Sequence, residues 1–178
     1  MTTSKQTTNS YPLSSTQREI WFDQLLHPDI PLYNIGGYLR INGPIDRILF
    51  EQALDQVIQE NDALRIILQE GENLPSQMVA EHAPFKLDYY DFPWRKQAHQ
   101  LALKWMKQAF AKPFQLYDKP LFQFALLKIA KEGYYLFNKY HHLIVDGWAI
   151  SLNAQQFAAA YNALLANPSI PNQPVIPI

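Results

Sequence analysis

The sequence predicts an α/β fold in which helices flank a mixed sheet. Segments with helical periodicity alternate along the chain with short, extended apolar runs. Two of these runs, 121–130 and 135–142, are separated by a short segment that contains glycine, which is typical of a hairpin. The chain has 178 residues, 48% of them hydrophobic, so it is long and apolar enough to bury a sizeable core. Helices interspersed with strands and hairpins in this way indicate a layered domain.

Local signals mark the ends of the predicted helices. Ser14 and Gln17 fit a capping box at the start of the first helix, and the two prolines of "HPDIP" mark the end of that helix. Asp46 is a good N-cap for the clearest amphipathic segment, in which apolar residues recur at helical period. The helices are expected within 11–26, 47–61, about 95–111 and 147–165, and the strands at 33–42, 63–68, 76–80, 85–91, 121–130 and 135–142.

The aromatic and basic side chains have ordinary structural interpretations. Trp21 and Trp148 are predicted to be core residues. The tyrosines and phenylalanine between 134 and 140 are predicted to pack within the sheet. Four lysines mark a solvated helix face, namely Lys96, Lys104, Lys107 and Lys112.

Composition excludes several classes of function. A net charge of -1 with no basic stripe argues against nucleic acid as a partner. No apolar run approaches the roughly 18 residues that a membrane span requires, so no membrane partner is expected. With no cysteine there is neither a disulfide framework nor a cysteine nucleophile. The polar N-terminus, 1–10, is expected to be flexible and lacks the apolar stretch of a signal peptide, which favours a cytoplasmic protein.

The stretch "YHHLIVDG" places His141 and His142 side by side at the end of a predicted strand. Successive side chains on a strand point to opposite faces, so the two rings do not easily converge on one metal ion. A pair of core histidines satisfied by local hydrogen bonds is one interpretation. The other is an acid/base site, because Asp146 and Gly147 follow at a strand-to-helix junction, where sheets usually present functional groups.

Several motifs decide between these interpretations. "HHLIVDG" has the form HHxxxDG, and "LSSTQREIW" resembles SxAQxRxW with Thr16 in place of alanine. "ENDALRIIL" resembles RHExLRTxF, keeping Leu64 and Arg65 but departing at five other positions. "KPFQLYDKPLFQFALLKI" resembles the stretch that precedes the histidine motif. In order and spacing across 11–165, the chain resembles the condensation domains of nonribosomal peptide synthetases, in the chloramphenicol acetyltransferase-like superfamily.

The resemblance implies a role for each motif residue. His142 matches the histidine that acts as general base or as an orienting hydrogen-bond acceptor, and His141 would help to hold the loop. Asp146 matches a structural aspartate, with Arg65 as its expected salt-bridge partner. Gly147 matches the position where the backbone approaches the reacting centre. An amine that attacks a thioester must lose a proton, and a neutral imidazole has suitable basicity for that step.

The resemblance also implies a larger assembly. Condensation domains have two lobes with a tunnel between them, and they join acyl and aminoacyl groups that carrier domains hold on phosphopantetheine. No cofactor is bound directly. We expect 11–166 to be the N-terminal lobe only and the proline-rich segment 167–178 to be a linker. Carrier domains, the C-terminal lobe and adjacent synthetase domains are then the expected partners, and the isolated lobe is expected to be inactive.

Three functional alternatives stay open from the sequence. The first is amide formation, in a domain that either starts or elongates a peptide. The second is a related transferase that uses acyl-coenzyme A, or an epimerisation domain. The third is a module that binds carrier domains without catalysis.

Overall fold

A four-stranded mixed sheet forms the centre of the protein. In the computed structural model, which describes residues 10–167 apart from 84, 94 and 132, its strand order is β2-β7-β6-β5. The strands β6 and β7 are antiparallel, whereas β5 pairs with β6 in parallel. The strands of this sheet are β2 (Asn34–Asn42), β5 (Asp88–Asp91), β6 (Phe122–Ala130) and β7 (Gly133–His141). The predicted hairpin and the predicted mixed sheet are therefore both confirmed.

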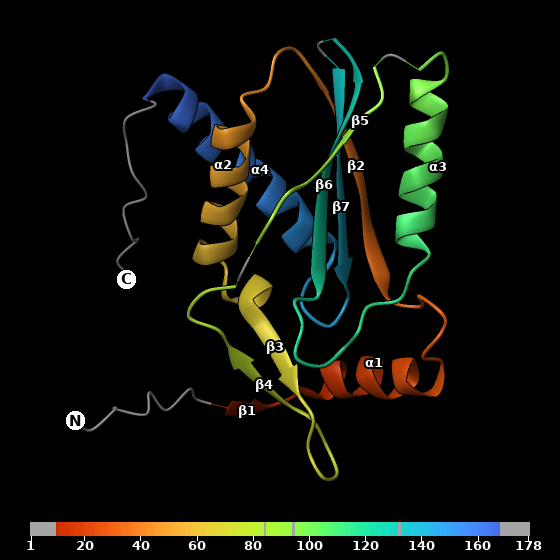
Figure 1. Ribbon diagram of the computed structural model, residues 1–178. Coiled ribbons are helices and arrows are strands. Elements are labelled where there is room, and N and C mark those ends of the chain that lie inside the picture. Colours follow the sequence, from red (N-terminus) through yellow and green to blue (C-terminus); the bar gives the residue numbers. More distant parts are fainter. Residues whose placement is uncertain (1–9, 84, 94, 132, 168–178) are drawn as a thin grey trace, which may run out of the picture.

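Helices cover both faces of this sheet. Figure 1 shows α2 and α4 on one side of the sheet and α3 on the other. A smaller sheet, with order β1-β4-β3, lies beside α1. The helices are α1 (Ser15–Leu26), α2 (Arg47–Glu60), the 3-10 turn η1 (Asp62–Arg65), α3 (Ala98–Phe110) and α4 (Gly147–Ala166). The remaining strands are β1 (Ser10–Pro12), β3 (Ile66–Gln69) and β4 (Ser76–Val79).

The strand β7 is buried along its whole length because it separates two hydrophobic cores. Leu136 and Tyr140 belong to the core under α2 and α4, whereas Tyr135 and Phe137 belong to the core under α3. This alternation follows from the two-residue period of a strand. The predicted sheet packing of these aromatic residues is confirmed. The histidine pair therefore lies at the end of a fully buried central strand.

The predicted helix caps are formed. Ser14 and Gln17 make a reciprocal capping box at α1, and the Asp46 carboxylate accepts the amides of Ile48 and Leu49. Phe50 of α2 packs edge-on against Phe157 of α4, with ring centroids 4.7 Å apart.

The third helix begins at 98 rather than near 95, and 63–65 form part of η1 rather than of the strand that follows. Ser10 belongs to β1, whereas 1–9 and 168–178 lie outside the described residues.

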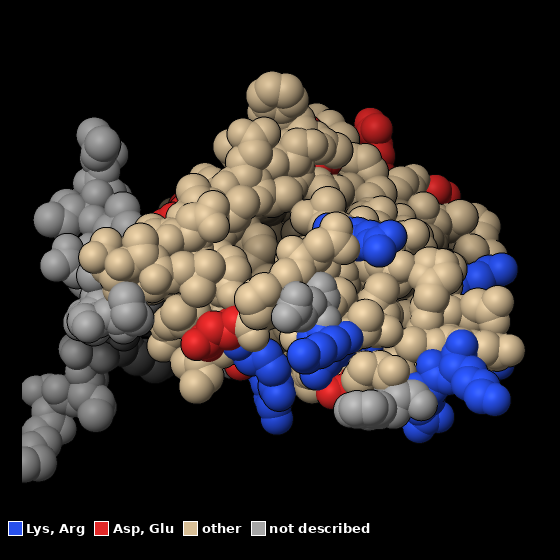
Figure 2. All heavy atoms as spheres, turned by 90° about the horizontal axis from the view of Figure 1, so that it is seen from above, with Lys and Arg blue, Asp and Glu red and all other residues tan. Residues whose placement is uncertain are grey.

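Charge is distributed unevenly over the surface. Figure 2 shows Lys and Arg gathered along one side of the face seen from above, with much of the rest uncharged. The predicted solvated lysines are all exposed; Lys104 and Lys107 lie on α3, and Lys96 and Lys112 flank it. Among the described helices, none is both long enough and apolar enough to cross a membrane.

Candidate functional site

The turn between β7 and α4 is held by backbone and side-chain hydrogen bonds from three directions. The His141 amide donates to the Leu121 carbonyl at 2.9 Å, and the His142 amide donates to the Tyr33 carbonyl at 2.8 Å. The Gln17 side chain, from the opening motif on α1, donates to the Leu143 carbonyl at 3.2 Å. Segments that are far apart in the sequence therefore fix the backbone on which the two histidines sit. This histidine turn, defined as 141–147, is the candidate site.

His141 is a buried, neutral core residue. The residue is only 1% exposed, and its Nδ1 atom accepts a hydrogen bond from the Leu143 amide at 3.2 Å. Because Nδ1 accepts, the proton of the neutral ring lies on Nε2, which has no hydrogen-bond partner among the described residues. Burial, with a smaller contribution from His142, lowers the pKa of His141 to about 4. The ring therefore stays uncharged at neutral pH and supports the turn from within.

His142 occupies a different environment one residue later. The strand ends at His141, so His142 lies in the turn, where it is partly exposed. Its backbone is anchored to Tyr33, but no side-chain hydrogen bond to another described residue holds its ring. Of the two adjacent imidazoles, His142 is thus the more exposed.

Asp146 caps α4 instead of forming the predicted ion pair. Its carboxylate accepts the Ala149 amide at 2.8 Å, and the residue is exposed. The Arg65 guanidinium instead contacts the Asp62 carboxylate and the carbonyls of Ala80 and Glu81. The predicted salt bridge between Arg65 and Asp146 is therefore wrong.

Local geometry explains this difference. Asp62 lies three residues before Arg65 in the same 3-10 turn, so the pair forms without any long-range folding. Asp146 has a local partner of its own, because the first amides of a helix lack carbonyl acceptors within the helix. Each charged group therefore has a partner close to it in the sequence, although Nε of Arg65 has no hydrogen-bond partner among the described residues. Asp146 thus acts as the N-cap of α4, without the ion pair on which its expected structural role was based.

Gly147 begins α4 in open space. A β-carbon added at this position would meet no atom within 4 Å, and its backbone is not in the left-handed region. Neither crowding nor strain within the described part of the chain therefore requires glycine here. The close approach of a substrate remains the prediction for this position.

A cavity lies between the two elements that the histidine turn joins. It has a volume of about 160 Å³, and its walls come from β7 and β6, from α2, and from the first half of α4. Leu136, Asn138 and Tyr140 of β7 face it across from Ser151 and Ala154 of α4. The lining is mostly apolar, so the cavity suits a hydrocarbon chain.

Sequence reasoning did not find this cavity. Ser151 and Ala154 are small residues three apart on a predicted helix, and this spacing was the available signal. Two buried amides also line the cavity, and the Oδ1 atom of Asn138 has no hydrogen-bond partner within the described residues. Burial raises the pKa of the Tyr140 phenol. The phenol is therefore protonated near neutral pH.

Trp148 is not a core residue, contrary to the prediction. It is 82% exposed, in the first turn of α4 directly after Gly147. Trp21, in contrast, is buried, and its indole N–H donates to the Tyr117 hydroxyl at 2.8 Å. Trp148 is the second residue of α4 and directly follows the exposed Asp146 and Gly147. A large exposed aromatic residue thus flanks the histidine turn.

The fold and the turn define a class: an α/β fold with a partly exposed imidazole at a strand-to-helix turn and a mostly apolar cavity between the two elements that the turn joins. Comparisons with known proteins agree with this class. The family model for the condensation domain matches residues 7–177. The chain belongs to the condensation domain family of nonribosomal peptide synthases.

Two curated relatives and one solved structure are particularly similar. The dimodular nonribosomal peptide synthase of Bacillus subtilis (strain 168) is 38% identical over 87% of this chain and 6% of its own length. The isonitrile lipopeptide synthase of Streptomyces coeruleorubidus is 36% identical over 88% of this chain and 11% of its own. The starter condensation domain of rhizomide synthetase RzmA is 36% identical with a TM-score of 0.86, covering 90% of this chain and 39% of that one. The chain therefore spans only a part of each relative.

Proposed function

We propose that 11–166 form the N-terminal lobe of a condensation domain, in which His142 assists amide formation between a donor thioester and an acceptor amine. The observation that carries this proposal is the contrast between two neighbouring imidazoles. His141 is sealed in the core, whereas His142 is partly exposed on a turn whose backbone is fixed by Tyr33. A catalytic group has to be accessible and its backbone well positioned, and the partly exposed ring and anchored amide of His142 are consistent with both requirements.

The chemistry follows from the reactants. The acceptor nitrogen forms a bond to the thioester carbon, the carbon–sulfur bond breaks, and the nitrogen loses a proton. The His142 ring accepts that proton, or orients the amine by accepting its hydrogen bond, and the thiol leaves with a proton. Such a group typically contributes about 100-fold to 10,000-fold to a rate, so the positioning of two tethered substrates supplies much of the remainder.

The cavity between β7 and α4 is the proposed site for the donor acyl chain. Its apolar lining favours hydrocarbon, and it lies between the two elements that the histidine turn connects. The rhizomide starter domain has been solved with C8-CoA, which supports a medium-length acyl donor for this chain as well. A fatty acyl group delivered by coenzyme A, or held on the phosphopantetheine of a carrier domain, would fit the same cavity.

A complete tunnel requires more than this lobe. The chain covers 39% of the rhizomide starter domain, and the exposed Trp148 beside the turn supports a covering partner. We propose that a second lobe and carrier domains are the partners, with the carriers supplying substrates on phosphopantetheine. The lobe alone would lack one wall of the tunnel and would not condense substrates.

The test fuses this chain to the second lobe of the rhizomide starter domain and supplies octanoyl-coenzyme A with leucyl-N-acetylcysteamine. We expect octanoyl-leucyl thioester from the fusion and none from the 178-residue chain alone. An Ala154→Leu fusion should lose octanoyl transfer but keep acetyl transfer, because leucine fills the cavity while a short chain still fits.

The outcomes separate the parts of the proposal. Turnover by the 178-residue chain alone would overturn the single-lobe assignment. A folded fusion that binds octanoyl-coenzyme A but forms no amide, beside an active rhizomide domain, would favour a binding module over an enzyme. An Ala154→Leu fusion that keeps full octanoyl transfer would remove the cavity from the donor site.

A further inference from the structure

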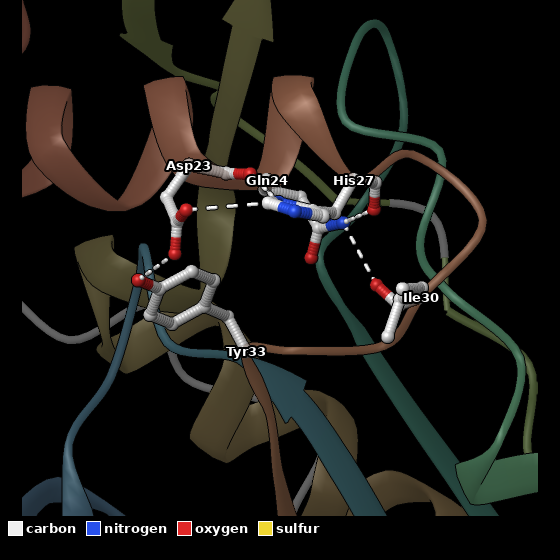
Figure 3. Close-up of polar contacts among 5 residues, drawn as sticks. All are labelled: Asp23, Gln24, His27, Ile30 and Tyr33. Atoms are coloured by element: carbon white, nitrogen blue, oxygen red, sulfur yellow. Dashed lines mark hydrogen bonds and ion pairs between the residues drawn. The ribbon is translucent and has the colours of Figure 1, made fainter.

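Tyr33 connects α1 to the histidine turn through three separate contacts. Its backbone carbonyl accepts the His142 amide at 2.8 Å. Its ring lies 6.1 Å from the His141 ring, centroid to centroid, at an angle of 45°. Its hydroxyl donates to the Asp23 carboxylate of α1 at 2.8 Å, as Figure 3 shows. One residue therefore touches both histidines and is itself tied to a helix.

The segment between α1 and β2 that leads to Tyr33 is fixed to the same helix. Gln24 is buried, and its side-chain amide donates to the carbonyls of His27 and Ile30 at 2.7 and 2.9 Å (Figure 3). The second oxygen of the Asp23 carboxylate lies 3.7 Å from the His27 ring nitrogen. These contacts fix the chain from α1 up to 30, and the Asp23–Tyr33 bond fixes the end next to the turn.

The residue after Tyr33 anchors the other histidine. Asn34 pairs with His141 across β2 and β7, and its side-chain amide donates to the carbonyls of Phe110 and Lys112 at 2.7 and 2.9 Å. Asn34 therefore connects the backbone of His141 to the end of α3. Tyr33 connects the backbone of His142 to α1 through its carbonyl and its hydroxyl.

The hydrogen bond between Tyr33 and Asp23 is the contact in this network that a mutation can remove selectively. A hydrogen bond to a charged acceptor is stronger than a neutral one. The same bond, followed by burial, raises the pKa of the Tyr33 phenol, so the hydroxyl stays a donor at neutral pH. The Asp23 side chain is 47% exposed, so the bond can be removed without opening the core.

We propose that Tyr33 is a positioning residue, whose hydroxyl bond to Asp23 fixes the carbonyl that holds the His142 backbone and so aims the His142 ring. The catalytic consequence rests on the function proposed above, whereas the structural link does not. A displacement of about 1 Å at a reacting group is enough to lower a rate by about 100-fold. Residues that hydrogen-bond to a catalytic residue, without touching the substrate, commonly determine how accurately the catalytic group is positioned.

Amide hydrogen exchange on the 178-residue chain tests the link directly. Tyr33→Phe should speed exchange of the His142 amide about tenfold, as expected when one hydrogen bond to a charged acceptor is lost. The His141 amide, which bonds to Leu121, and the amides of 134–138 should stay unchanged. Tyr38→Phe, on β2, the strand that begins directly after Tyr33, and 47% exposed, is the matched control and should change nothing at His142.

Variants at Asp23 complete the test. Asp23→Ala should reproduce the effect of Tyr33→Phe, Asp23→Asn should restore slow exchange because it keeps an acceptor oxygen, and the double variant should add nothing. In the two-lobed fusion, Tyr33→Phe should lower kcat about tenfold with KM unchanged. Unchanged exchange at His142, or equal acceleration along all of β7, would overturn the proposal whether or not the fusion catalyses amide formation.

Discussion

Replacing His142 with alanine is expected to lower the rate of amide formation in the two-lobed fusion by about 100-fold to 10,000-fold. The loss should fall on kcat and leave the fold intact, because the ring makes no hydrogen bond to another described residue. The backbone bond to Tyr33 does not depend on the side chain and should persist. Single-turnover product formation, with the unfolding midpoint measured in parallel, provides the measurement.

Two matched variants define what this result means. His82→Ala removes an exposed histidine that is distant in sequence from the histidine turn, and it should leave the rate of amide formation unchanged. His141→Ala removes the buried acceptor for the Leu143 amide, so it should lower the unfolding midpoint more than the rate of amide formation. A His142→Ala fusion within twofold of the wild-type rate would remove this residue from catalysis, whatever the other two variants do.

Acid is expected to destabilise the protein through His141. Its pKa falls from the ordinary value of 6.5 to about 4 in the folded state, chiefly because of burial. The unfolded chain therefore binds a proton between these values while the folded chain does not. The contribution is fully present above pH 6.5 and is lost as the pH falls toward 4, with a total of about 3 kcal/mol.

Denaturant unfolding of wild type and His141→Gln at pH 7 and at pH 4.5 measures this contribution. Carboxylates also affect stability in this range, so the difference between the two proteins is the relevant quantity. We expect the wild type to lose about 2 kcal/mol more free energy of unfolding than His141→Gln over this interval. His82→Gln should lose as much as the wild type. Equal losses in wild type and His141→Gln would mean that His141 is not kept neutral by burial.

Local signals in the sequence predicted much of the fold. The Ser14–Gln17 capping box, the Asp46 cap and the hairpin of β6 and β7 all depend on residues close together in the chain, so their patterns could be read directly. The parallel pairing of β5 with β6 joins more distant segments, and only the mixed class of the sheet was predicted. The histidine turn was found from its motif, but not the carbonyl of Tyr33 that holds it.

Two side-chain predictions are incorrect. The Arg65–Asp146 ion pair and the burial of Trp148 were both long-range expectations. Each charged residue instead has a partner close in the sequence, Arg65 in Asp62 and Asp146 in the start of α4, and Trp148 lies exposed in that same first turn. A motif indicates which residues belong together, whereas the side-chain partners depend on distances that only the folded chain sets.

The central claim is that the His142 ring is presented to substrate while the His141 ring is sealed. Diethyl pyrocarbonate, which acylates accessible neutral imidazoles, tests this on the 178-residue chain, with peptide fragmentation to distinguish the two adjacent residues. We predict modification of His142, slowed by octanoyl-pantetheine, and none of His141 while the protein stays folded. Modification of His141 as fast as His142, or an unreactive His142, would contradict the claim.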